Sequence, residues 1–491
     1  MPFEDFREVW PLILVCECLP ANVPETHIAS GGWIRGDKAD YDQWSQQVQD
    51  ARWSYDGLLP YFRRSEHFHK ADADPSQHGF DGPMHTSTPS SSGRKYPLRD
   101  ASFRMWLQAG FQGISDANAG YPQGIAELVD NRRDGLRQLT SDVYRLDGVT
   151  AMTGTIVKRV ILEQIDGHQR AVAVELEDGS QIKLATNGEI IASAGAYRTP
   201  QRLMLSGIGD PEVLSQHKIQ TIVDLPDVGQ HLHDHLMCFR YWSLRHPEQG
   251  LAMGSPALTD PSFMKGNPVD WIVTSTIPET KLDIAMKHDA ANPVKNSTTW
   301  PNSKSASRSH LELLMFYGAF AGEQIGLEIP LDGKSVMTYC MGCLPTSRGY
   351  VTIRSDNPSD APVIDPNYYA TEVDRMVMRE GWRTMSKAIL ETSAGQELVK
   401  GEILPTGHSE LRSDAADDSI DARIKIGAMT TYHPAGTASM GKVVDGSLNV
   451  NGVKGLRVAD ASVIPVPLAA HYQAAIFAIA EQAVDIILGD R

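Results

Sequence analysis

The stretch Glu189-Ile190-Ile191-Ala192-Ser193-Ala194-Gly195-Ala196-Tyr197-Arg198-Thr199-Pro200 decides the fold class of this 491-residue chain. Its first six residues form a short β-type run, which is typical of a strand buried on both faces of a parallel sheet. The run leads through a glycine turn into a predicted helix, where Pro200 suits the first turn. Strand, glycine turn and helix in this order are the layout of a nucleotide-binding α/β layer.

The residues before this stretch predict a small antiparallel sheet. Three β-type runs, at 156–162, 171–176 and 181–184, are separated by Asp166-Gly167 and Asp178-Gly179. An Asp-Gly pair between such runs is a hairpin signal, so we expect a three-stranded meander.

Composition excludes several function classes. The chain has 45 Lys and Arg against 61 Asp and Glu, a formal net charge of -16, which argues against nucleic acid or an anionic membrane as a partner. Five cysteines in this length do not form a disulfide scaffold. The apolar run Trp10–Cys16 is too short to span a bilayer and follows acidic residues. We therefore expect no membrane partner and a cytoplasmic chain, with secretion possible if a signal peptide was lost with the N-terminus.

Several long motifs occur in one order along the chain. They are Arg35-Gly36-Asp37-Lys38-Ala39-Asp40-Tyr41-Asp42-Gln43-Trp44, the segment Gly195–Gly209, Val228-Gly229-Gln230-His231-Leu232-His233-Asp234-His235, and the closing segments His433–Gly441 and Leu456–Gln473. Together they closely resemble the glucose–methanol–choline (GMC) oxidoreductase family. One departure is His231, where the family usually has Asn.

This resemblance implies an α/β plus α+β protein, with a three-layer FAD/NAD(P)-type domain and an inserted antiparallel-sheet substrate domain. The expected division is 1–28 as an atypical leader, 29–240 as an incomplete FAD-binding domain, 241–428 as the substrate-binding domain, and 429–491 as the return to the FAD-binding domain.

The resemblance also implies FAD as cofactor and a small-molecule alcohol as substrate, oxidised by proton abstraction and hydride transfer. His433 is the implied base, since a neutral imidazole accepts a proton near neutral pH. His471 is its implied second polar partner. The implied cofactor-binding residues are Gly31, Gly32, Val157, Ala194, Gly195, Asp460, Ala461 and Gln473.

The fingerprint that holds the FAD pyrophosphate is absent. No Gly-x-Gly-x-x-Gly turn occurs between a first strand and a first helix, and residues 1–28 contain no glycine. We therefore expect that the first βαβ unit is missing, that the N-terminal domain is truncated, and that FAD binding is weakened. Three accounts remain open: a truncated or mis-spliced chain, an FAD-independent descendant, or a weakly held flavin.

The substrate class follows from a finer likeness. The Arg35–Asp42 block and the Ala470-His471-Tyr472-Gln473 ending look most like fungal members that tailor secondary metabolites, which implies a polyketide-derived or aromatic alcohol. The alternatives are a non-redox cyclase or dehydratase on the same scaffold, and an inactive truncated member. His231, His233 and His235 could be read as metal ligands, but no second metal-like spacing accompanies them, so no metal is predicted. The sequence does not set the oligomeric state or the electron acceptor.

Overall fold

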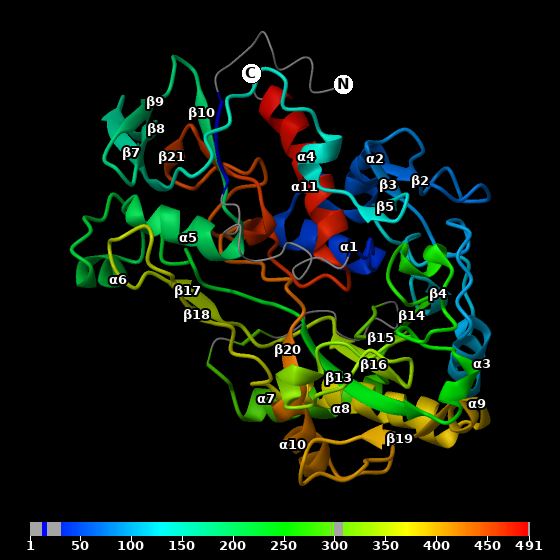
Figure 1. The fold of residues 1–491 in the computed structure, drawn as a ribbon. Helices are drawn as coiled ribbons and strands as arrows, with labels where there is room; N and C mark the ends of the chain where they lie inside the picture. Colours follow the sequence, from blue (N-terminus) through cyan, green and yellow to red (C-terminus); the bar gives the residue numbers. More distant parts are fainter. Residues whose placement is uncertain (1–11, 17–30, 296, 299–307, 490–491) are drawn as a thin grey trace.

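The computed structural model describes residues 12–16, 31–295, 297–298 and 308–489. They form two lobes, each with its own large cluster of buried apolar residues, which Figure 1 shows one above the other. Trp44 and Trp53 stack in the core of the upper lobe, and Trp242 and Trp382 are buried in the core of the lower one. Two cores of this size agree with a chain built from two domain-like units.

A parallel sheet lies at the centre of the upper lobe. Its order is β1-β10-β22, from β1 (Leu12–Cys16), β10 (Glu189–Ser193) and β22 (Leu456–Val458). The strand predicted at Glu189–Ala194 is therefore confirmed as the middle strand of the sheet. Beyond it, α5 (Gly195–Leu205) begins directly at the glycine turn, several residues earlier than the predicted start at Pro200.

The predicted meander covers one side of the parallel sheet. Strands β7 (Val157–Ile165), β8 (His168–Leu176) and β9 (Gln181–Lys183) are antiparallel neighbours, as the two Asp-Gly pairs predicted, and β21 (Val453–Lys454) pairs with β8. On the other side Figure 1 shows helices α1 (Lys38–Val48), α2 (Tyr55–Ser65) and α11 (Tyr472–Gly489). The three layers expected for the cofactor domain are thus present.

Helix α11 is long and apolar enough to cross a membrane by length and composition. Half of that stretch is buried inside the protein, and the helix packs against α2. This packing is typical of a core helix.

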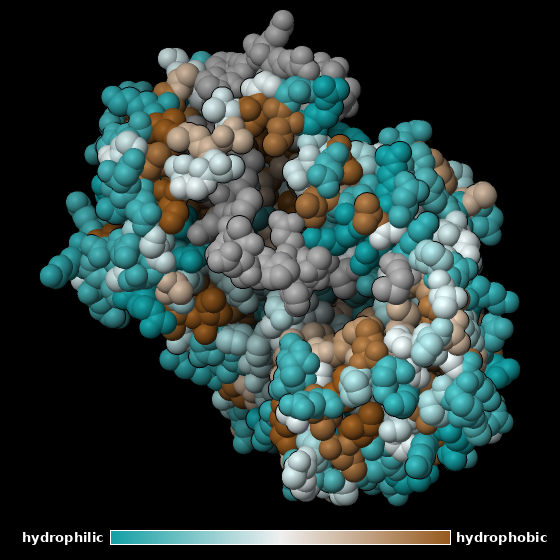
Figure 2. Space-filling model, in the orientation of Figure 1, coloured by the Kyte–Doolittle hydropathy of each residue, from teal (hydrophilic) through white to brown (hydrophobic). Residues whose placement is uncertain are grey.

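The lower lobe is built on a seven-stranded antiparallel sheet of order β19-β13-β16-β15-β14-β4, with β20 also paired to β13. Helix α8 (Glu372–Ser386) packs on its central strands, and α7 (Glu279–Ala291) packs on α8. The strands are β4 (Gly124–Glu127), β13 (Leu236–Leu244), β14 (Trp271–Ser275), β15 (Leu311–Phe316), β16 (Ser335–Gly342), β19 (Val399–Ile403) and β20 (Ala428–Thr430). Figure 2 shows hydrophilic side chains over most of this face, with apolar ones gathered over the lower lobe.

A buried ion pair joins the edge strand β19 of the lower sheet to its neighbour β13. Arg240 on β13 bonds to Glu402 on β19 at 2.8 Å, and its guanidinium lies over the rings of Trp242 and Trp382. Since both charged groups are fully buried, each needs the other to offset the cost of leaving water.

The structure differs from the sequence prediction at the N-terminus. Leu12–Cys16, which we expected to belong to an atypical leader, form β1 and pair in parallel with Glu189–Ser193. The remainder of that predicted leader, residues 1–11 and 17–28, lies outside the described residues. The predicted domain boundaries are not otherwise tested, although the lower sheet includes β4, from the stretch assigned to the cofactor domain.

Candidate active site

The two predicted catalytic histidines lie side by side between the lobes. His433 follows β20 of the lower sheet, and His471 immediately precedes α11 of the upper lobe. Their ring centroids are 5.5 Å apart, and the rings are tilted by 38°. Both rings keep a partly accessible side, which a group that meets a substrate requires.

Asp234 holds the backbone at His433. Its carboxylate accepts a hydrogen bond from the backbone N–H of His433 at 2.9 Å, and further bonds from the hydroxyl groups of Thr430 and Tyr368. Asp234 ends the segment that leads into β13, so this contact joins two segments distant in sequence. A buried carboxylate with several donors is costly to remove, and we infer that it fixes the position of His433.

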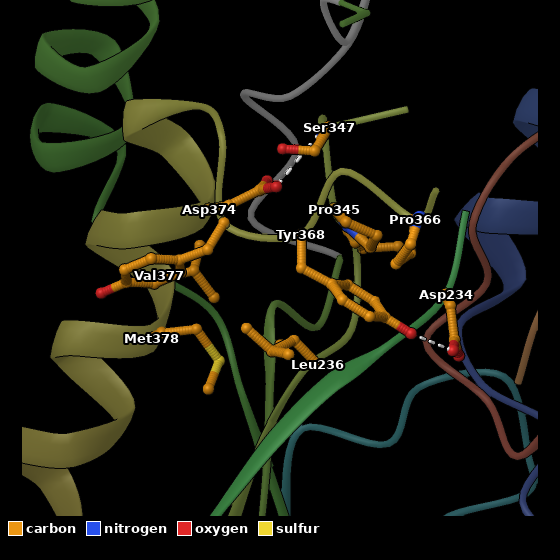
Figure 3. Close-up of a pocket in the computed structure, with 12 residues that line it drawn as sticks. Asp234, Leu236, Pro345, Ser347, Pro366, Tyr368, Asp374, Val377 and Met378 are labelled. Atoms are coloured by element: carbon orange, nitrogen blue, oxygen red, sulfur yellow. Dashed lines mark hydrogen bonds between the residues drawn. The ribbon is translucent and has the colours of Figure 1, made fainter. Parts of the chain in front are cut away.

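A small cavity lies on the lower-lobe side of Asp234. Figure 3 shows Tyr368 reaching across it to Asp234, with Leu236, Val377 and Met378 forming apolar wall. The lining does not include His433 or His471. Asp234, which lines the cavity, links it to the histidine pair through its bond to the backbone N–H of His433.

His471 is paired with a buried acid from the lower sheet. Its Nε2 lies 2.9 Å from Oε1 of Glu312 on β15, and Glu312 is buried. Burial opposes a charge on the His471 ring, but the Glu312 carboxylate outweighs it and the pKa of His471 is raised. His471 is thus held toward its protonated form.

His433 has the opposite environment. Its Nδ1 lies 3.0 Å from Nδ1 of His235, and no acid of the described part of the chain pairs with its ring. Burial, and then the neighbouring His235 and His471, lower the pKa of His433 well below its usual range. Burial together with His471 also lowers the pKa of His235, to about 3. Both imidazoles are therefore neutral at neutral pH.

Two adjacent histidines with oppositely shifted pKa values suit a division of labour. The neutral ring of His433 can accept a proton, and the charged ring of His471 can stabilise a negative oxygen beside it. The positive charge of protonated His471 also contributes to the low pKa of His433. The protonated state of His471 and the neutral state of His433 therefore favour each other.

Four of the eight predicted cofactor-binding residues gather at the carboxyl edge of the parallel sheet. Ala194 and Gly195 follow β10, and Asp460 and Ala461 follow β22. The backbone N–H of Gly195 donates to Asp460 at 2.9 Å, which ties the two strand ends together. A Cβ added at Gly195 would have no described atom within 4 Å, so there is open space beside this glycine in the described part of the chain. Ligands of open α/β sheets bind at such an edge.

Three predicted glycine and glutamine positions surround His471. A Cβ on Gly32 would lie 2.3 Å from Nδ1 of His471, so the backbone passes directly against that ring. Gly31 has a positive φ of 94° and lies against Asn131. Oε1 of Gln473, on the first turn of α11, is buried with no hydrogen-bond partner. A buried amide oxygen without a partner is unusual and fits a bound group that would donate to it.

Val157 is placed apart from this group. It begins β7, the meander strand that packs against α5. Its predicted contact would therefore be with a different part of the cofactor from the part at the sheet edge and His471. At the other seven positions, around the sheet edge and His471, the open space beside Gly195 and the orphaned amide oxygen of Gln473 fit an extended cofactor such as FAD. The glycine fingerprint remains absent from the sequence between β1 and Gly31.

The row of histidines at 231, 233 and 235 does not converge. His231 bonds to Asp227 at 2.6 Å, while His233 is buried and lies 3.1 Å from the carbonyl of Ile464. Among the described residues, the ring nitrogens of these three histidines do not come together as a metal-ligand group. Cys340 and Cys343 are buried free thiols.

A two-lobed chain with an open parallel-sheet edge facing a histidine pair defines a nucleotide-cofactor oxidoreductase. Comparison with known proteins narrows this class. Profiles of the GMC oxidoreductase family match residues 25–237 and 345–480. The chain belongs to the GMC oxidoreductase family. It is an oxidoreductase that acts on CH–OH donors, and its cofactor is FAD.

Relatives and solved structures agree with this assignment. A GMC-type oxidoreductase, acuG, of Aspergillus aculeatus is 37% identical over 458 residues, covering 93% of this chain and 82% of that one. An oxygen-dependent choline dehydrogenase of Vibrio vulnificus is 30% identical, covering 93% and 78%. Formate oxidase of Aspergillus oryzae superposes with a TM-score of 0.80 at 27% identity, covering 95% of this chain and 83% of that one. A fungal aryl-alcohol oxidase, 22% identical with a TM-score of 0.77, shares the fold.

The comparisons do not support one expectation. Because the N-terminal family profile covers residues 25–237, the predicted truncation of the N-terminal domain is not confirmed. The physical basis of that expectation was the missing glycine fingerprint, and a profile can match the remaining motifs of the domain without it.

Three groups at the site were not assigned a role by the sequence. Glu312 stands on a strand with no motif around it, so only the pairing of β15 with its neighbours brings it to His471. Asp234 and His235 were visible within a family-like motif, but their contacts with His433 depend on β13 pairing with β20. The motif was the available signal for these two residues, and no signal existed for Glu312.

Proposed function

We propose that this chain oxidises a neutral alcohol of the polyketide-derived or aromatic kind, with His433 as proton acceptor and His471 as the charged partner. The observation that carries the proposal is the opposed electrostatics of the two rings: Glu312 pairs with His471, and only neutral His235 contacts the His433 ring as a hydrogen-bond partner.

The proton path starts at His433. For its Nε2 to carry a lone pair toward the substrate hydroxyl, its Nδ1–H must donate to Nδ1 of His235. His235 then keeps its own proton on Nε2 and accepts through Nδ1. Burial and His471 lower the pKa of His235 to about 3, which keeps this ring neutral as the acceptor of the His433 hydrogen bond. FAD, when bound, supplies the acceptor for the hydride that leaves the carbinol carbon.

The charge on His471 acts on the alcohol oxygen. As the hydroxyl proton leaves, negative charge grows on that oxygen, and a fixed positive ring nearby stabilises it. Glu312 holds the charge on the ring, and the close backbone at Gly32 holds its orientation.

A neutral substrate is supported by how the acids are used. Glu312 is already bonded to His471, and Asp234 accepts from three donors. Neither carboxylate is therefore available to pair with a cationic substrate group. The fungal, secondary-metabolite class is supported by the motif likeness of Arg35–Asp42 and of Ala470–Gln473, and by the match to a fungal GMC-type oxidoreductase.

The test is spectroscopic. The chain is purified, its FAD content is measured, and a panel of aryl, polyketide-derived and cationic alcohols is added without oxygen. The proposal predicts that neutral aryl or polyketide-derived alcohols bleach the visible flavin absorbance and that choline does not. A folded, colourless protein that rearranges a substrate without oxidising it would contradict the proposal in favour of non-redox chemistry.

A further inference from the structure

Three histidines, none of them part of the His433–His471 pair, meet on the surface of the upper lobe. His67 lies on β2 (Glu66–Phe68), His69 follows that strand, and His85 lies on β3 (Met84–Thr86). The two strands are parallel neighbours, and their register places His67 opposite His85. Residues two apart on a strand share a face, so His69 joins the same face.

The three rings are stacked closely. Centroid distances are 4.6 Å from His67 to His69, 4.5 Å from His67 to His85, and 4.9 Å from His69 to His85. One nitrogen from each ring lies within 4.8 Å of the others. Nε2 of His69 and Nδ1 of His85 are only 2.6 Å apart, so one of these nitrogens carries a proton that the other accepts.

A metal ion fits this spacing with small movements. Nitrogen ligands at about 2.0–2.1 Å in tetrahedral geometry stand about 3.3 Å from one another. The close pair must open slightly and His67 must approach. His69 is exposed, so its ring can turn without displacing packed atoms.

The surrounding charges are mixed. Arg133, on the short strand β5 (Arg132–Arg133) that packs on β3, opposes a cation, and Asp134 beside it favours one. Burial, the neighbouring rings and Arg133 lower the pKa of His69 and of His85, which keeps these rings in the neutral form that binds metal.

We propose that His67, His69 and His85 form a surface site for one divalent transition-metal ion of the class that prefers imidazole, such as Zn²⁺. Three imidazoles leave at least one coordination position for water or a donor from another molecule. The ion would tie β2 to β3 and so brace the loop between them. This site is separate from the alcohol-oxidising centre.

The test uses the full chain with its FAD, without a polyhistidine tag and after treatment with a chelator. Zn²⁺ is titrated by calorimetry, and bound metal is counted by elemental analysis. We expect one Zn²⁺ per chain and a higher melting temperature on binding. Losing an outer partner of a metal ligand already costs about 10–100-fold in affinity, so His69→Ala and His85→Ala should each weaken binding by at least about 100-fold.

The matched control is His168→Ala, which removes an exposed histidine at the start of β8 and should bind Zn²⁺ as the unmodified chain does. Because His69 is exposed, His69→Ala is expected to fold, and its melting temperature without metal checks this. The proposal is overturned if the unmodified chain binds no Zn²⁺. It is equally overturned if His69→Ala binds as tightly as the unmodified chain, because the ion would then be held by other histidines.

Discussion

Replacing Glu312 by Gln should remove the negative charge that holds His471 in its protonated form. The change keeps the size of the side chain and a hydrogen-bonding group beside Nε2 of His471, and it removes the carboxylate charge. Burial, which opposes a charged ring, is then no longer outweighed, so the pKa of His471 should fall. The substitution tests whether the charge on His471 is needed for oxidation.

The contact between His471 and Glu312 sets an upper and a lower limit on the free energy that the carboxylate charge contributes to protonation of His471. Unit charges 2.9 Å apart attract by about 6 kcal/mol at an effective dielectric constant of about 20, which is an upper limit because desolvation offsets much of it. A lower limit is the difference between a charged and a neutral hydrogen bond, about 1–1.5 kcal/mol. Even this lower limit reduces the protonated fraction of His471 about tenfold at high pH.

The assay is kcat/KM for alcohol oxidation across pH, corrected for FAD content. We expect the fall in activity at high pH to move to lower pH in Glu312→Gln, with at least about a tenfold loss at about pH 8. Glu323→Gln, at an exposed acid of the same lobe, is the control and should leave the profile unchanged. If Glu312→Gln folds, binds FAD and keeps the unmodified profile, the role given to the Glu312–His471 pair is refuted.

Two further substitutions test the site. Gly32→Ala places a methyl group 2.3 Å from Nδ1 of His471, so the ring must move. We expect the free energy of unfolding in urea to fall by about 1–3 kcal/mol, together with a lower kcat. Unchanged values for both would contradict the close approach of the backbone to the ring. His433→Ala removes the proton acceptor, so the rate at which alcohol bleaches the bound flavin should fall to about a thousandth of the unmodified rate or less. Retention of the full rate would exclude His433 from this role.

The parts of the fold with local signals were predictable from the sequence. Asp166-Gly167 and Asp178-Gly179 set the hairpin turns of the meander, and Asp166 and Gly167 both take the positive φ that such turns require. Ser54, a residue type that favours the position before a helix, accepts a hydrogen bond from the N–H of Gly57 at the start of α2. These features depend on a few neighbouring residues.

Features that depend on distant pairing were not predictable. Leu12–Cys16 have a β-type composition, but only the parallel register with Glu189–Ser193 places them in the central sheet. Glu312 reaches His471 because β15 is aligned by β14 and β16. The metal-ligand cluster likewise depends on β2 lying parallel to β3, which brings His85 beside His67.

The candidate site was found by motif, and its electrostatics were found by structure. The sequence placed His433 and His471 together through their family-like surroundings. It gave no indication that one ring is paired with an acid and the other with a neutral imidazole, because both partners lie far away in the sequence and only strand pairing in the lower sheet brings them to the site. That difference is what assigns a separate task to each histidine.

The pH dependence of kcat/KM for the unmodified, FAD-loaded chain tests this division most directly. His433 must be neutral, so activity should be retained below the usual histidine pKa of about 6.5 and be lost only at lower pH. His471 must be protonated, so activity should persist above that value and fall at higher pH. The account predicts a bell-shaped profile with its plateau spanning the usual histidine pKa. A single limb that rises through the usual value and never falls would contradict it.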